Sequence, residues 1–219
     1  MEANDVKDAL TAHYDAAASQ RDTRGLVDFR DGYRRRFADL LGQERIGELV
    51  DLGAGTGHES LWFTQQGLTV SAVDLSPAHV ELCRAKGIEA AVGDFYDLPF
   101  RSSRFPAGWC MSSLMHVPNA DLDLVLREIG RIFEPDAPVA LGFWGGRDTE
   151  GIWERDSAQP KRFYSLRSEA TMRDALGGHF DLVEFETREV EGVSGWPYQF
   201  WIVRRPRGLK LGAVGPSGP

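Results

Sequence analysis

Hydrophobic positions follow two different periods along the chain. Residues 1–45 carry apolar side chains at helical spacing, as at Phe29, Tyr33 and Phe37, and predict N-terminal helices. From Ile46 onward, short apolar runs typical of strands alternate with amphipathic stretches typical of helices. Strands are expected at 46–52, 68–74, 88–92, 105–111, 139–144, 180–190 and 197–203, and helices at 58–66, 77–86, 121–133 and 168–176. This alternation predicts an α/β fold with a mostly parallel sheet, helices on both of its faces, and a ligand site at the carboxyl ends of its strands.

Composition and charge exclude several classes of protein. The 219 residues predict one domain over 1–206, with a helical cap over about 1–45 and a flexible Gly/Pro-rich tail over 207–219. The net charge of −8 disfavours nucleic acid as a partner, and we expect Arg34 to Arg36 to lie on a solvated helix face. No apolar run approaches the roughly 20 residues that span a bilayer, and no signal peptide is evident. Cys83 and Cys110 lie far apart, so we expect two buried thiols, no metal site and a cytoplasmic location.

A glycine-rich segment follows the first predicted strand. Gly53, Gly55 and Gly57 allow a tight turn and a close approach to a ligand at the start of the next helix. The spacing differs from the nicotinamide fingerprint, which has glycine where this chain has His58, and no P-loop lysine follows. Asp51 precedes the loop, and a carboxylate there suits a cationic ammonium better than a pyrophosphate.

Two more carboxylates follow neighbouring predicted strands. Asp74 lies 21 residues after Gly53, a position from which a carboxylate can accept from both ribose hydroxyls. Asp94 follows the third strand. It could accept from an adenine amino group, with Phe95 or Leu75 against the ring, or it could cap a turn.

Together, these segments resemble the class I S-adenosylmethionine-dependent methyltransferases of the small-molecule type. The matching stretches are 50–57, 73–77, 93–94 with 98–100, 111–118 and 126–133, and the resemblance spans roughly residues 10 to 205. It implies a Rossmann-like sheet of seven strands in the order 3-2-1-4-5-7-6, with strand seven antiparallel. It also implies S-adenosylmethionine as cofactor and S-adenosylhomocysteine as product. The implied cofactor-binding residues are Tyr14, Asp51, Gly53, Ala54, Gly55, Gly57, Asp74, Leu75, Ser76, Gly93, Asp94, Phe95 and Ser112.

Two scaffold positions depart from the family pattern. Relatives commonly have Phe-Asp before strand four, where this chain has Phe105 and Pro106. Relatives usually have Pro-Gly-Gly before strand five, and here Asp136 must make that turn, which Asp tolerates better than most residues.

The acceptor side of the site is less defined by the sequence. His116 is the candidate base, or it packs against the cofactor as a neutral ring, while His79 is expected at the surface or in packing. The segment after strand five is expected to form the acceptor pocket or its lid, with Trp144, Glu150, Trp153, Arg162 and Phe163 as pocket residues.

The predicted function is methyl transfer to an oxygen or nitrogen atom of a small organic acceptor, which could be a specialised metabolite. Proximity and alignment would do most of the work. The partner is expected to be that small molecule, with no nucleic acid and no membrane, and the chain to be a monomer or homodimer. The alternatives are a non-catalytic S-adenosylmethionine-binding or regulatory module of the same fold and, less favoured, an NAD-dependent reductase.

Overall fold

A computed structural model describes residues 3–156, 158–191 and 195–208 of the chain. Over these residues the helices are α1 (Ala3–Asp22), α2 (Asp31–Gln43), α3 (His58–Gln65), α4 (Pro77–Ala85), α5 (Leu122–Ile132) and α6 (Glu169–Gly177), with 3-10 helices η1 (Asp28–Arg30), η2 (Leu114–His116) and η3 (Asn119–Asp121). The strands are β1 (Glu48–Leu52), β2 (Thr69–Asp74), β3 (Glu89–Val92), β4 (Gly108–Met111), β5 (Pro138–Trp144), β6 (Thr149–Ile152), β7 (Phe163–Leu166), β8 (Asp181–Arg188) and β9 (Tyr198–Arg204). None of the described helices combines the length and apolarity needed to cross a membrane.

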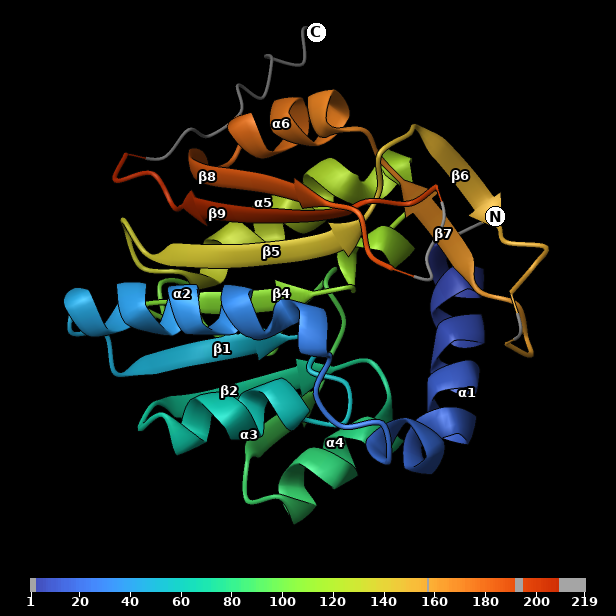
Figure 1. The fold of residues 1–219 in the computed structure, drawn as a ribbon, viewed down its shortest axis with the longest axis horizontal. Coiled ribbons are helices and arrows are strands. Elements are labelled where there is room, and N and C mark those ends of the chain that lie inside the picture. The colour runs from blue at the N-terminus through green and yellow to red at the C-terminus, as the bar shows by residue number, and fades with distance from the viewer. Residues whose placement is uncertain (1–2, 157, 192–194, 209–219) are drawn as a thin grey trace, which may run out of the picture.

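Seven of these strands form one sheet in the order β3-β2-β1-β4-β5-β9-β8. β1 to β5 pair in parallel, whereas β9 pairs antiparallel with both β5 and β8. This is the strand order that the family resemblance implies, so the predicted fold class is confirmed. The parallel strands all end at the same edge of the sheet, and α1 lies across that edge together with β6 and β7 (Figure 1).

Both faces of the sheet are covered by helices. α2 and α3 pack on one face, where Phe37 and Phe63 are fully buried against Trp109 of β4. α5 and α6 pack on the other, with Ile129 and Met172 in the same apolar cluster as Trp201 of β9. Buried on both faces, the parallel strands consist almost entirely of apolar residues, which is why they appear in the sequence as short continuous runs.

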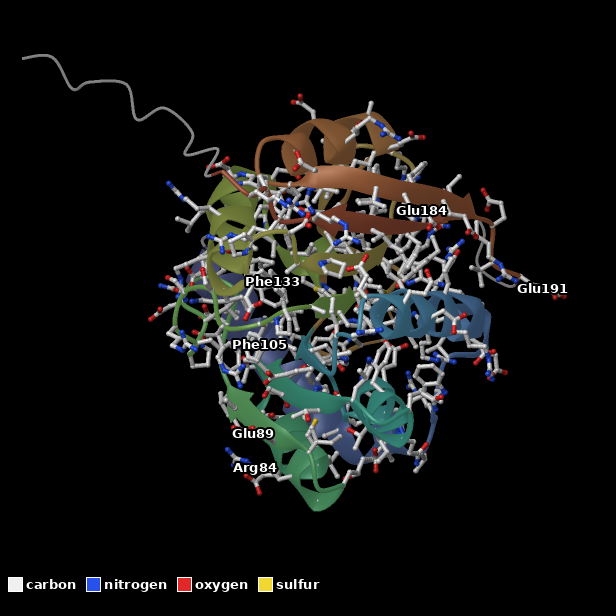
Figure 2. All side chains as sticks on the ribbon, turned by 90° about the vertical axis from the view of Figure 1, so that its left-hand side faces the viewer. Arg84, Glu89, Phe105, Phe133, Glu184 and Glu191 are labelled. Carbon is white, nitrogen blue, oxygen red and sulfur yellow. The ribbon has the colours of Figure 1, made fainter. Side chains whose placement is uncertain are left out.

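The fourth strand begins later than predicted. It starts at Gly108 rather than Phe105, because Pro106 has no N–H to donate to a strand ladder. Phe105 makes only an isolated bridge to Phe133, and both side chains, labelled in Figure 2, are buried in the same apolar cluster. The turn before β5 is built as expected, with Asp136 at φ +70° in place of a glycine.

The predicted acceptor loop contains a small second sheet that sequence analysis did not predict. β6 and β7 pair antiparallel, from Thr149 opposite Leu166 to Ile152 opposite Phe163. Arg167, directly after β7, ties this hairpin to the segment after β4 by donating to the carbonyls of Leu114 and Val117 at 3.1 and 2.5 Å. Residues 209–219 of the predicted tail lie outside the described residues.

Candidate active site

A cavity of about 310 Å³ lies at the carboxyl edge of the parallel strands. Its walls come from the segments that follow β1, β2, β3 and β4, and from α1 and the connection between α1 and α2. The predicted site residues meet there: Tyr14, Asp51, Gly53, Ala54, Gly55, Asp74, Leu75, Gly93, Asp94, Phe95, Ser112 and His116 all line it. Gly57 and Ser76, which cap the N-termini of α3 and α4, are not in the lining.

The glycine loop has the backbone conformation that only glycine adopts easily. Gly53 has a φ of +71°, and a Cβ built on it would lie 2.1 Å from Oγ of Ser113. Gly57 has a φ of +83°, and a Cβ there would lie 2.8 Å from Sγ of Cys83. Side chains at these positions would force the loop away from the β4 end and from α4. The glycines therefore bring bare backbone to the cavity wall.

Asp74 holds this loop in place. Its Oδ2 accepts from the backbone N–H of Gly55 at 2.8 Å, and its Oδ1 accepts from the N–H of Ser76 at 2.9 Å. Oδ1 also accepts from Nδ1 of His79 at 3.1 Å. An ionised carboxylate has about four acceptor sites, so one remains for a hydroxyl donor in the cavity.

Of the two alternatives for His79, surface or packing, the structure shows packing. It is 2% exposed, because α4 packs its first turn against the end of β2 and turns the imidazole toward Asp74. Its Nδ1 donates to Asp74, while its buried Nε2 has no partner among the described residues. Since His79 lines the cavity, that nitrogen is available to a ligand.

Asp94 caps a turn and also pairs with α1. Its Oδ1 accepts from the N–H groups of Tyr96 and Asp97 at 2.8 and 3.1 Å. Its Oδ2 lies 2.9 Å from Nζ of Lys7, whose ammonium is 4.9 Å from the ring centre of Tyr96. The capping interpretation is thus correct, and it leaves the carboxylate in the cavity wall, where Phe95 also lies.

The opposite end of the cavity contains two carboxyl groups close to buried arginines. Asp51 is 2% exposed and accepts from Oγ of Ser60 at 2.6 Å, and burial raises its pKa to about 8. Glu59 pairs with both Arg30 and Arg34 at 3.3 Å. It also accepts from Nε1 of Trp109 at 2.5 Å. Glu59 is thus balanced by arginines and Asp51 is mostly protonated at pH 7, so these two carboxyl groups add little net negative charge to the cavity before a ligand binds.

Arg30 is a cavity-lining cation near Glu59 that sequence analysis missed. It donates to Oγ of Ser112 at 2.5 Å, and its buried Nε lacks a partner within the described part of the chain. Ser112 has a φ of +56°, a strained conformation for a residue with a side chain. The predicted solvated run of arginines is wrong at Arg34, while Arg35 and Arg36 are partly exposed to solvent. Arg34 is buried against Glu59, and Arg36 pairs with Glu184 and Glu186 on β8.

His116 and Tyr14 form a hydrogen-bonded pair in the cavity wall. Nδ1 of His116 lies 2.8 Å from the carbonyl oxygen of Phe163 and must donate to it, because a carbonyl only accepts. Nε2 then carries the lone pair and accepts from the Tyr14 hydroxyl at 2.8 Å. Burial lowers the pKa of His116 to about 4. The imidazole is therefore neutral at pH 7, in one defined tautomer.

Comparison with known proteins places this geometry in a family. Residues 50–141 match the model of a methyltransferase domain. The 27-O-demethylrifamycin SV methyltransferase of Amycolatopsis mediterranei is 28% identical over 190 residues, which cover 82% of this chain and 69% of that protein. A ubiquinone biosynthesis O-methyltransferase of Xanthomonas oryzae pv. oryzae is 30% identical over 135 residues, which cover 58% of this chain and 54% of that protein.

The solved structures agree on the fold. Burkholderia thailandensis 1,6-didemethyltoxoflavin-N1-methyltransferase, solved with that compound and S-adenosylhomocysteine, superposes with a TM-score of 0.71 at 19% identity, over 94% of this chain and 91% of that one. Residues 50–141 belong to the methyltransferase-domain family, and the fold is that of the class I S-adenosylmethionine-dependent methyltransferases. The matched region spans only 36% and 54% of the lengths of two of its curated relatives.

The cavity fits S-adenosylmethionine, the cofactor of this family. Two buried nitrogen atoms of cavity residues, Nε of Arg30 and Nε2 of His79, lack partners among the described residues, and each can pair with a polar group of a ligand. One belongs to the guanidinium beside Ser112 and the other to the imidazole beside Asp74. A ligand that is polar at both ends satisfies both atoms.

The structure does not bring the five predicted acceptor residues into the cavity lining. Trp144 packs against Phe29 and Tyr198, and Trp153 against Tyr164 and Trp196. The other three bind within the segment 149–166 or pack it against α1. Glu150 accepts from Ser165 at 2.6 Å, Arg162 pairs with Asp156 at 2.8 Å, and Phe163 packs against Val6 and Leu10 of α1.

Sequence reasoning missed the charged residues that α1 and the following connection place in the cavity wall. These are Lys7 and Arg21 on α1, on either side of the predicted Tyr14, and Arg24 and Arg30 after it. The spacing of seven between Lys7, Tyr14 and Arg21 is the signal that could have found them, since residues seven apart share a helix face. Tyr14 alone of these three was chosen as a site residue, through the family resemblance.

Proposed function

We propose that this chain transfers the methyl group of S-adenosylmethionine to an oxygen or nitrogen atom of a small organic acceptor and releases S-adenosylhomocysteine. The observation that carries the proposal is the pairing of the glycine loop with Asp74. The carboxylate holds the loop through Gly55 and keeps an acceptor site open toward the cavity. This arrangement offers a bare backbone and a ribose acceptor at the edge where ligands of such sheets bind.

The charges of the cavity match the two ends of the cofactor. Asp51 would accept from the ammonium of the methionine part, and the free Nε of Arg30 would donate to its carboxylate. Asp74 would accept from a ribose hydroxyl, and the unpartnered Nε2 of His79 would contact the same sugar. Asp94 and Phe95 would border the adenine.

The bound cofactor supplies an activated methyl group, so the protein mainly provides proximity and alignment. The proton of the acceptor also needs a path. We propose that it passes to the Tyr14 hydroxyl oxygen while the hydroxyl proton moves to Nε2 of His116, which becomes an imidazolium. A pKa of about 4 suffices for this step, because an oxygen that has gained a methyl group is strongly acidic and gives up its proton readily. Phe163, through its carbonyl, keeps the lone pair of His116 on the correct nitrogen.

The hairpin of β6 and β7 borders this proton path, and we propose that it forms the outer wall of the acceptor site. Trp153 packs on Tyr164, and Tyr164 lies 4.9 Å from the His116 ring. The hairpin would therefore shape the acceptor site through His116 even where its own side chains do not reach the acceptor.

The proposal is tested by titrating the chain with S-adenosylhomocysteine in a calorimeter and by measuring S-adenosylhomocysteine release with a panel of hydroxyl and amine acceptors. Asp74→Asn should weaken binding by at least about ten-fold, because a ribose acceptor is lost. Asp97→Asn, with its side chain outside the cavity lining, is the control. Equal affinity of Asp74→Asn and the parent chain would overturn the assignment of the site. Tight binding without turnover across the panel would favour the non-catalytic module, and preference for NAD(H) would favour the reductase.

A further inference from the structure

The cavity contains two cations that form no ion pair with its carboxylates. Lys7 pairs with Asp94, and Arg30 pairs with Glu59. Arg21 and Arg24 also line the cavity, but neither side chain forms an ion pair or a hydrogen bond with any of the described residues. The unpaired guanidinium groups thus lie at the C-terminal end of α1 and just beyond it.

Arg21 is held in a surrounding that makes its charge costly. Its guanidinium stacks over the ring of Tyr14 at 4.9 Å, and the residue is half-buried. Burial and the positive charges of Arg162 and Arg24 lower its pKa. Arg162 cannot relieve this charge, since its own guanidinium is occupied by Asp156 through bonds of 2.8 and 2.9 Å. An unpaired and partly desolvated guanidinium that faces a cavity needs an anion.

The cofactor does not fill that need. Its methionine carboxylate belongs to the end of the cavity where Asp51 lies, and Arg30 is the free donor there. Arg21 lies instead beside Tyr14, whose hydroxyl faces His116. The sulfonium of the cofactor would add a further positive charge to the same cavity. The vacant anion position is thus beside the proton path rather than at the cofactor end.

We propose that the acceptor of this methyltransferase is a small organic carboxylate, whose charge is bound by Arg21 and Arg24. This inference rests on the proposed function and names its substrate class. A guanidinium binds a carboxylate through two parallel N–H donors, which fixes the orientation of the acceptor as well as its position. With the carboxylate on Arg21, the rest of the acceptor lies over Tyr14, where its proton is removed.

Calorimetric titration with matched pairs of probes tests this inference. The probes are salicylate with its neutral amide salicylamide, and trans-aconitate with its neutral trimethyl ester, each at constant ionic strength, with and without S-adenosylhomocysteine. We expect at least one carboxylate to bind at least about ten-fold more tightly than its neutral partner. The double variant Arg21→Gln, Arg24→Gln should abolish that preference, whereas Arg21→Lys should retain part of it.

The control is Arg35→Gln, which removes one positive charge, as Arg21→Gln does, from an exposed residue that pairs with Asp31 on α2. It should leave the carboxylate preference unchanged. S-adenosylhomocysteine affinity should stay within about two-fold of the parent in every variant, and the far-ultraviolet circular dichroism should match. Three results would overturn the proposal. They are no carboxylate preference in the parent chain, a preference that survives the double variant, and a loss of S-adenosylhomocysteine affinity in Arg21→Gln that would assign Arg21 to the cofactor. Failure of the proposed function is separable, since it would appear as absent S-adenosylhomocysteine binding or absent turnover while the anion preference persists.

Discussion

Asp51 should lose a proton when the cofactor product binds. In the free protein, burial raises the pKa of this carboxyl to about 8, from an ordinary value of 3.8. The difference corresponds to about 6 kcal/mol against ionisation, even with the hydrogen bond from Ser60. At pH 7, about nine-tenths of the molecules therefore carry the proton. A ligand ammonium beside Asp51 should lower the pKa of this carboxyl, because the positive charge stabilises the ionised form.

The number of protons released follows from two titrations. S-adenosylhomocysteine is a free amino acid, and its ammonium is almost fully charged at pH 7. Formation of the pair between this ammonium and ionised Asp51 should thus release about 0.9 proton at pH 7, and fewer protons as the pH rises through the raised pKa of Asp51. Release at pH 7 identifies a carboxyl with a raised pKa, since an ordinary carboxyl would release nothing at that pH.

The assay is calorimetric titration of S-adenosylhomocysteine in phosphate and in Tris, whose ionisation enthalpies differ. The slope of observed enthalpy against buffer ionisation enthalpy gives the protons exchanged. Asp51→Asn is the matched variant, because it keeps the shape and cannot ionise. It should show almost no release at pH 7 and bind at least about ten-fold more weakly. A parent chain whose enthalpy at pH 7 does not depend on the buffer would refute this account of Asp51.

Three further outcomes follow from the site and its scaffold. Gly53→Ala should lower the free energy of unfolding in urea by about 1–3 kcal/mol, because its Cβ would meet Ser113 at a positive φ; an unchanged midpoint would contradict the strain. Tyr14→Phe should slow methyl transfer by about 10²-fold with S-adenosylhomocysteine affinity nearly unchanged, and equal loss of both would place Tyr14 in cofactor binding alone. The pKa of His116 is lowered to about 4 in the folded state against 6.5 unfolded, so the unfolded chain binds the proton first and stability falls as pH drops from about 6.5 to 4. The loss reaches about 3 kcal/mol, and His116→Gln should remove this part of the pH dependence of urea unfolding.

The sequence predicted the sheet well because local signals determine it. Each parallel strand is a short apolar run bounded by a loop, and the glycine loop and Asp74 mark where two of the strands end. The hairpin of β6 and β7 lacks such a signal. Its residues neither alternate clearly nor form an apolar run, and the hairpin is anchored by the distant contacts of Arg167 with Leu114 and Val117. Contacts of that kind are invisible in a local pattern.

The same distinction separates the predicted residues that line the cavity from those whose surroundings the sequence left open. Asp51, Gly53 and Asp74 line the cavity because their places relative to the strands decide their positions. For His79 the sequence could not choose between surface and packing, because its burial depends on how α4 docks against the end of β2. Arg34 was misjudged because its partner, Glu59, lies 25 residues away and belongs to another helix.

The cavity is lined partly by residues inside the segment that matches the family and partly by residues that precede it. The family match covers residues 50–141 and includes the cavity carboxylates Asp51, Asp74 and Asp94, whereas Tyr14, Arg21 and Arg30 all precede it. The C-terminal end of α1 is tied to the end of α4 by Asp22, which pairs with Lys86 at 2.6 Å. Under the proposal that Arg21 and Arg24 bind the acceptor, chains that share the matched segment can share a cofactor and still differ in acceptor, because these two charges lie outside the matched segment. For this chain those charges are positive and unpaired among the described residues, which is the physical reason to search for its acceptor among carboxylates.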